Sequence, residues 1–150
     1  MEQHHLDQAS QCALQILEHP IHLIDGVADT LEYLADRHDL ILFTKGDPAE
    51  QQAKIERSGI HHLFDHAMIV KEKDMAAYEN LAGVRKFEVS RTWMVGNSPK
   101  SDINPSLAAG WNAALVPHAR TWSLEQMDIL NPGPGRLLML DRFTDLQKHF

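Results

Sequence analysis

Hydrophobic positions near the start of the chain recur at helical spacing. Between residues 6 and 19 they are Leu6, Ala9, Ala13, Leu14 and Leu17, which share one face of a helix, and Pro20 ends the run, so this pattern predicts a leading helix. A second amphipathic pattern, from Val27 to His38, predicts another helix. It leads into the apolar run Leu40-Ile41-Leu42-Phe43, which is typical of a strand buried on both faces of a parallel sheet.

The alternation of helix and strand continues to the end of the chain. Pro48 suits the first position of a helix that reaches about Arg57, and Ser58-Gly59 ends that helix. Strands that alternate with helices predict one α/β domain with a Rossmann-like, doubly wound parallel sheet. The further elements are expected as strands at 67–70, 92–95, 113–116 and 136–140, and as helices at 75–81, at 103–109 and from about 143.

Composition and charge narrow the classes of partner. The 150 residues, 43% of them hydrophobic, are enough for one sizeable core. A formal net charge of -7 argues against nucleic acid or an anionic membrane as the main partner. No apolar stretch approaches the roughly 20 residues that span a bilayer. The single cysteine, Cys12, offers no disulfide framework, which favours a cytoplasmic location.

Candidate chemistry lies just after the predicted strands, because ligands of open parallel sheets bind beyond the carboxyl ends of the strands. Thr44 ends the first apolar strand. Its hydroxyl and the amides of Lys45 and Gly46 are candidates for binding a phosphoryl oxygen. Lys71 and Lys73 follow the second strand, and either can place an ammonium group against the same phosphate.

The third strand is followed by a turn with oxygen ligands, Gly96-Asn97-Ser98-Pro99-Lys100-Ser101-Asp102. The amide oxygen of Asn97 and the carboxylate of Asp102 suit a hard cation such as magnesium. Taken singly, these features have simpler explanations: Thr44 as a turn residue, an exposed lysine as a solvated side chain, Asp102 as a helix cap. Three successive strand ends that carry a hydroxyl, an ammonium and a carboxylate together predict one binding site.

From about Val27 onward, these motifs resemble those of the haloacid dehalogenase-like hydrolases, in the branch with an inserted helical cap. Residues 40–47 are similar to the family's second motif, whose threonine binds the substrate phosphate. Residues 69–74 are similar to the third motif, whose lysine steadies the nucleophile and the phosphoryl group. Residues 93–103, continued by Ala108-Ala109-Gly110, are similar to the fourth motif, a metal-binding loop.

The resemblance implies functions for individual residues. It favours Lys73 over Lys71 as the catalytic lysine, because Tyr78 then falls near a position where family members carry an aromatic residue. It implies that Thr44, with the turn after it, binds phosphate. It also implies a Mg²⁺ site at Asn97 and Asp102, and a small phosphorylated molecule as the substrate.

The sequence departs from the family pattern in two places. The fourth motif usually has Gly-Asp where this chain has Gly96-Asn97, so Mg²⁺ binding is expected to be weakened. The first motif is a hydrophobic strand that ends in Asp-x-Asp, and no Asp-x-Asp occurs in the 150 residues. The resemblance therefore predicts that the nucleophilic aspartate, the general acid/base two residues later and the central strand that bears them are absent.

Two segments look superficially like that first motif. In residues 21–30, Leu23 stands where the nucleophile belongs, and the segment fits better as the approach to the helix from Val27. In residues 137–145, Asp141 follows an apolar run, but Phe143 replaces the acid/base. The family's ordinary closing strand and helix explain this second segment.

These observations predict an incomplete core domain at 21–150, preceded at 1–20 by a remnant of the last cap helix. The chain is expected to descend from a Mg²⁺-dependent phosphomonoester hydrolase and to be inactive as given. Two alternatives stay open: a non-catalytic module that binds phosphate or a partner, and the product of a truncated gene. An absent central strand would leave edges open to a partner strand or a second copy of the chain. A dehalogenase is less favoured, because that reaction needs the same aspartate.

Overall fold

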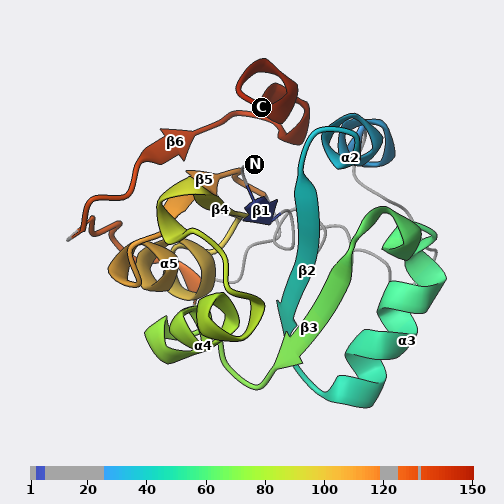
Figure 1. Cartoon of the computed structure of the whole chain (residues 1–150), viewed down its shortest axis with the longest axis horizontal. Helices are drawn as coiled ribbons and strands as arrows, with labels where there is room; N and C mark the ends of the chain where they lie inside the picture. The colour runs from blue at the N-terminus through green and yellow to red at the C-terminus, as the bar shows by residue number, and fades with distance from the viewer. Residues whose placement is uncertain (1–2, 6–25, 119–124, 132) are drawn as a thin grey trace.

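The strands form one parallel sheet. The structure is a computed structural model, and it describes residues 3–5, 26–118, 125–131 and 133–150. Its six strands lie side by side in the order β3-β2-β1-β4-β5-β6 (Figure 1). In chain order they are β1 (Gln3–His5), β2 (Asp39–Lys45), β3 (His66–Val70), β4 (Thr92–Gly96), β5 (Asn112–Leu115) and β6 (Leu137–Met139).

Helices and shorter helical turns connect these strands. The α-helices are α2 (Val27–Ala35), α3 (Pro48–Ser58), α4 (Met75–Arg85) and α5 (Asn104–Ala108). A π-helical turn, Pro99–Ile103, runs directly into α5. Short 3-10 turns lie at His61–Leu63, Val89–Arg91 and Phe143–Lys148.

The apolar strand β2 packs against helices on both faces. Leu40 contacts the cluster formed with α2 and the C-terminal turn, and Leu42 packs with Ile55 of α3. The alternating residues Ile41 and Phe43 pack on the other face against α4. Figure 1 shows α4 and α5 on the opposite side of the sheet from α2 and α3. Each of these buried side chains stabilises the fold by about 1.5–3 kcal/mol relative to an exposed one. The run 40–43 therefore helps to hold the helices on both faces of the sheet.

Turn and cap residues fix where the helices begin and end. Asp47 caps α3 by accepting a hydrogen bond from the amide of Glu50, and Pro48 occupies the first turn. Gly59 ends α3 with φ of +75°, a left-handed conformation that glycine adopts without strain. Asp74 caps α4 by accepting from the amide of Ala77.

The predicted α/β parallel fold is confirmed, and the expected elements from Val27 onward are present with small shifts of their ends, except that the closing helix expected from about 143 is the 3-10 turn Phe143–Lys148. The helix expected at 103–109 differs most, because its start is replaced by the π-helical turn at Pro99–Ile103 and only Asn104–Ala108 is α-helical. The helix expected at 6–19 lies outside the described residues.

The expected gap at the centre of the sheet is filled. β1 lies between β2 and β4 and pairs with both in parallel register, with His4 opposite Leu40 and Trp93. Its sequence, Gln3-His4-His5, has no apolar run, so the hydrophobic pattern did not predict a strand there. A strand flanked on both sides is held by backbone hydrogen bonds to two neighbours, which a side-chain pattern does not reveal. Residues 3–5 of the predicted cap remnant therefore belong to the core sheet.

Candidate functional site

The phosphate-binding residues predicted after β2 are held by contacts within the protein. Thr44 is fully buried, and its hydroxyl donates to Oε1 of Gln51 at 3.1 Å. The amide of Gly46 donates to the carbonyl of Val70 at 2.9 Å. A ligand that bound these two groups would have to replace Gln51 and Val70 as their partners.

A buried ion pair joins the loop after β3 to the π-helical turn after β4. Nζ of Lys73 lies 2.5 Å from Oδ1 of Asp102, and neither side chain is exposed to solvent. Nζ also lies 3.5 Å from the carbonyl oxygen of Phe43 at the end of β2. The structure thus brings together Lys73 and Asp102, two of the residues that the sequence singled out, while Lys71 is exposed.

Burial dominates the electrostatics of Asp102. Loss of solvent raises the pKa of its carboxyl group to about 6, although the ammonium of Lys73 and the amide of Ser98 both lower it. Oδ2 accepts the Ser98 amide hydrogen at 2.9 Å. Both carboxylate oxygens are therefore engaged by groups of the protein.

The π-helical turn places Asp102 in this position. The side chain of Ser98 accepts a hydrogen bond from the amide of Ser101 at 2.9 Å, which caps the turn. The hydroxyl of Ser106 donates to the carbonyl of Asp102 at 2.6 Å. Single π-helical turns occur frequently at functional sites, where they redirect a side chain.

Tyr78 ties the same turn to α4. Its hydroxyl donates to the carbonyl of Ser101 at 2.8 Å. Its ring makes edge contacts with Phe43 and Trp111, with centroids 5.1 and 5.0 Å apart. The aromatic residue that the family resemblance pointed to therefore contacts both the π-helical turn and the core.

Lys45 takes part in a second, more accessible ion pair. Its Nζ donates to Oγ of Ser101 at 2.8 Å and lies 2.8 Å from Oε1 of Glu125. The Ser101 hydroxyl donates to the same oxygen of Glu125 at 2.6 Å. Glu72, on the loop after β3, approaches Lys45 to 3.9 Å with a side chain that is 73% exposed.

The Glu125 carboxylate is stabilised in its charged form. Partial burial raises its pKa, but the hydrogen bonds from Lys45 and Ser101 and the positive charges of Lys45 and Lys100 outweigh burial and lower it overall. Sequence reasoning did not find Glu125. It lies well beyond the end of β5 and in no periodic pattern, so no local signal marked it.

The described residues do not fit a magnesium ion. Asn97 and Asp102 are both buried at the end of β4, but Asn97 is neutral and the Asp102 carboxylate already binds Lys73 and Ser98. Magnesium needs about six oxygen ligands in octahedral geometry. Among the side chains that the structure describes, at 26–118, 125–131 and 133–150, no group of three His, Cys, Asp or Glu residues is arranged to hold a metal ion.

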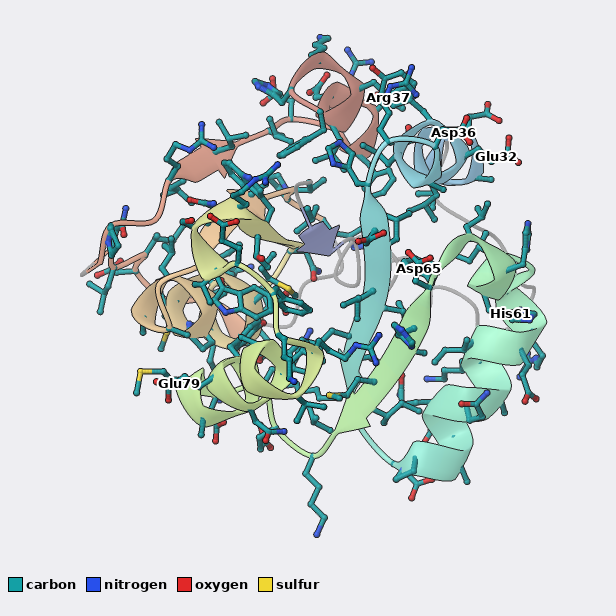
Figure 2. All side chains as sticks on the ribbon, viewed as in Figure 1. Glu32, Asp36, Arg37, His61, Asp65 and Glu79 are labelled. Carbon is teal, nitrogen blue, oxygen red and sulfur yellow. The ribbon has the colours of Figure 1, made fainter. Side chains whose placement is uncertain are left out.

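Two pockets flank the sheet at opposite ends. One, of about 380 Å³, lies beside the site and is lined by the loop before α4 and by α5, with Lys73, Met75, Lys100 and Leu130 among its residues. The other, of about 260 Å³, lies where β2 and β3 begin and includes Asp65 and Arg85. Figure 2 shows Asp65 at the start of β3, where its Oδ2 accepts the amide hydrogen of Leu40 at 2.8 Å. Only the first pocket adjoins the predicted site residues.

Comparison with family models decides the family. Residues 2–116 match the model of the haloacid dehalogenase-like hydrolases. The chain belongs to that family. A comparison with curated protein sequences gave no match.

Solved structures of haloacid dehalogenase-like proteins resemble this one over most of its length. A family hydrolase from Xanthomonas campestris is 30% identical, with a TM-score of 0.76 over 89% of this chain and 55% of its own. A phosphatase from Thermococcus onnurineus is 18% identical, with a TM-score of 0.66 over 85% of this chain and 58% of its own. A 2-haloacid dehalogenase from Pseudomonas syringae is 24% identical, with a TM-score of 0.65 over 87% of this chain and 54% of its own. The chain spans little more than half the length of these proteins, and the last two show the shared fold alone.

Proposed function

We propose that this domain binds the phosphoryl group of a small molecule at the carboxyl ends of β2, β3 and β4. The observation that carries the proposal is the fully buried pair of Lys73 and Asp102 at those strand ends. Taking two charges out of water costs several kcal/mol per ion, and such a pair adds little to stability compared with an apolar pair. A buried ion pair at the ligand-binding edge of a parallel sheet is therefore better explained by function than by folding.

Several residues around the pair of Lys73 and Asp102 would contact the phosphoryl group. The ammonium of Lys73 offsets the negative charge of a phosphoryl group, and the Thr44 hydroxyl with the Lys45 and Gly46 amides supplies hydrogen bonds. We expect Asn97 and Asp102 to bind Mg²⁺ weakly at best, since the one carboxylate is already neutralised by Lys73.

We further propose that these 150 residues derive from a phosphomonoester hydrolase and do not hydrolyse phosphomonoesters by themselves. The family reaction begins when an aspartate attacks phosphorus, and the sequence contains no Asp-x-Asp. The test is release of para-nitrophenol from para-nitrophenyl phosphate with Mg²⁺ present. We expect no turnover above buffer. Turnover that the Lys73→Ala variant abolishes would overturn this part of the proposal.

The second candidate is a non-catalytic module that keeps the anion site for sensing or for association with another chain, and the position of β1 changes the argument for it. β1 pairs with both β2 and β4, so an open central gap no longer argues for a partner strand. What supports the module is the charged site without the first motif. Phosphate that raises the melting temperature saturably, without turnover, supports a module; no rise and no turnover support a fragment without function.

The remaining alternatives have less support. The similarity to a 2-haloacid dehalogenase reaches the fold alone, and that chemistry also needs a carboxylate nucleophile. In the part of the chain that the structure describes, no helix is long and apolar enough to cross a membrane. A cytoplasmic location and association with a second copy of the chain stay predictions from the sequence.

A further inference from the structure

One anion-binding position at the site is filled by the protein's own carboxylate. Lys45 comes from the end of β2 and Ser101 from the π-helical turn after β4, so their side chains meet across the carboxyl end of the central strand β1. Both donate to a single oxygen, Oε1 of Glu125, at 2.8 and 2.6 Å. We call Lys45 and Ser101 the Lys45–Ser101 subsite.

We propose that the Lys45–Ser101 subsite binds a terminal phosphate oxygen of the ligand, and that Glu125 is an internal competitor which the ligand displaces. This inference rests on the proposed phosphoryl-binding function and names the groups that make first contact. The bound carboxylate oxygen stands in for a phosphate oxygen, since both accept charge-assisted hydrogen bonds of similar length.

The donors of the subsite are held in place without Glu125. Ser101 is fixed on two sides, by its amide hydrogen bond to Ser98 and by the Tyr78 hydroxyl that donates to its carbonyl. Lys45 extends from a strand paired in register with β3, opposite Val70, and its Nζ also donates to Oγ of Ser101 at 2.8 Å. A ligand therefore meets a preorganised ammonium and hydroxyl once the carboxylate leaves, which lowers the entropy lost on binding.

Glu125 is placed by a separate anchor. Asn104 of α5 donates to the carbonyl of Asp128 at 2.7 Å and accepts from the amide of Leu130 at 2.8 Å. These bonds hold the segment after Glu125 against α5, and they involve neither Lys45 nor Ser101. The segment can therefore remain anchored while the Glu125 side chain rotates away from the subsite.

Charge favours phosphate over the internal carboxylate. Lys100 and Lys45 both act on Glu125 electrostatically, and Lys73 lies behind the same turn against Asp102. A phosphate group near neutral pH carries between one and two negative charges, whereas a carboxylate carries one. The greater charge lets phosphate gain more from the same cations.

The test compares inorganic phosphate binding by calorimetry in the wild type and three variants. Glu125→Gln removes the competing charge and keeps the shape of the side chain. Glu72→Gln is the matched control, because it also removes one negative charge near Lys45 but from an exposed side chain at 3.9 Å. Lys45→Met removes the ammonium and keeps most of the side-chain length. Circular dichroism checks that each variant is folded.

We expect Glu125→Gln to bind phosphate about tenfold more tightly than wild type, a factor equivalent to about 1.4 kcal/mol. Glu72→Gln is expected to stay within about twofold of wild type, because an exposed charge is screened by water and salt. Lys45→Met is expected to weaken binding about tenfold or more. A purely structural ion pair would leave the phosphate affinity of Glu125→Gln unchanged, and this result would overturn the inference.

Other results separate the two proposals. Equal gains in Glu125→Gln and Glu72→Gln would overturn the inference, because they would reflect net charge alone. Phosphate binding by a folded Lys45→Met variant as tight as that of wild type would also overturn it and leave the proposed function standing. Absence of phosphate binding in the wild type and in Glu125→Gln would overturn both.

Discussion

At the scale of single residues, the site depends on two lysine–carboxylate pairs with different exposure. Lys73 and Asp102 are both fully buried, whereas Lys45 and Glu125 retain 26% and 15% of their side-chain exposure. Breaking a buried pair leaves an unpaired charge in a medium of low polarity, while a solvated pair is weakened by water and salt. Removing one partner of the first pair should therefore destabilise the fold more than removing one partner of the second, and the second pair should be easier for a ligand to open.

Removal of Lys73 tests the first pair. Lys73→Met leaves the buried Asp102 carboxylate without its cation, so we expect the free energy of unfolding to fall by about 3–5 kcal/mol in urea titrations at pH 8. The double variant Lys73→Met with Asp102→Asn removes both charges and should lose less than the sum of the two single variants. A loss under about 1 kcal/mol for Lys73→Met would contradict the buried pair.

The second pair has a predictable dependence on pH. The folded pKa of Glu125 lies below its ordinary value of 4.5, so the native state binds this proton more weakly than the unfolded state does. Its contribution to stability is complete above that ordinary value and is lost as pH falls through the lower folded pKa. We therefore expect wild type to be more stable than Glu125→Gln at pH 7, with the difference vanishing in acid. A difference that grows on acidification would contradict the assignment.

At the scale of elements, caps and turns decide where the functional side chains lie. The apolar run 40–43 and the break after it located β2 and Thr44, because a buried strand leaves a clear hydrophobic pattern. The π-helical turn was not foreseen, since Pro99–Ile103 has the composition of an ordinary turn before a helix. Glu125 was missed for a related reason, because its role depends on contacts between distant segments and not on local sequence.

The start of α4 offers a test at this scale. Asp74 caps the helix that carries Tyr78 by accepting the amide hydrogen of Ala77 at 2.9 Å. Asp74→Ala removes this bond and should lower the free energy of unfolding by about 1 kcal/mol. Asp74→Asn keeps an acceptor at the cap and should stay close to wild type in the same denaturant titration. Equal losses in the two variants would show that the cap hydrogen bond is not the cause.

At the scale of the whole molecule, the sheet is continuous through its centre. The sequence predicted the fold class and the alternation of strands and helices, because those follow from hydrophobic periodicity. It did not predict β1, whose three residues are polar and whose place is set by hydrogen bonds to β2 and β4. A continuous sheet brings the ends of β2 and β4 to a fixed spacing, on which the contact between Lys45 and Ser101 depends.

A proline in β1 tests this continuity. His4→Pro removes the backbone donor at the middle residue of a strand paired on both sides, so we expect a loss of about 3 kcal/mol or more in the free energy of unfolding. His4→Val keeps the donor and is the matched control. Thermal unfolding of His4→Pro that matches wild type would show that residues 3–5 do not hold the centre of the sheet.

Amide chemical shifts during a phosphate titration test the central claim most directly. In two-dimensional ¹H–¹⁵N spectra, we expect inorganic phosphate to move the amide signals of residues 44–46, 71–73 and 97–102 saturably and together, with one dissociation constant. These are the loops that the buried pair of Lys73 and Asp102 joins at the carboxyl ends of the strands. Shifts that do not saturate, or that centre on Asp65 and Arg85 at the opposite end of the sheet, would contradict a phosphoryl-binding site here.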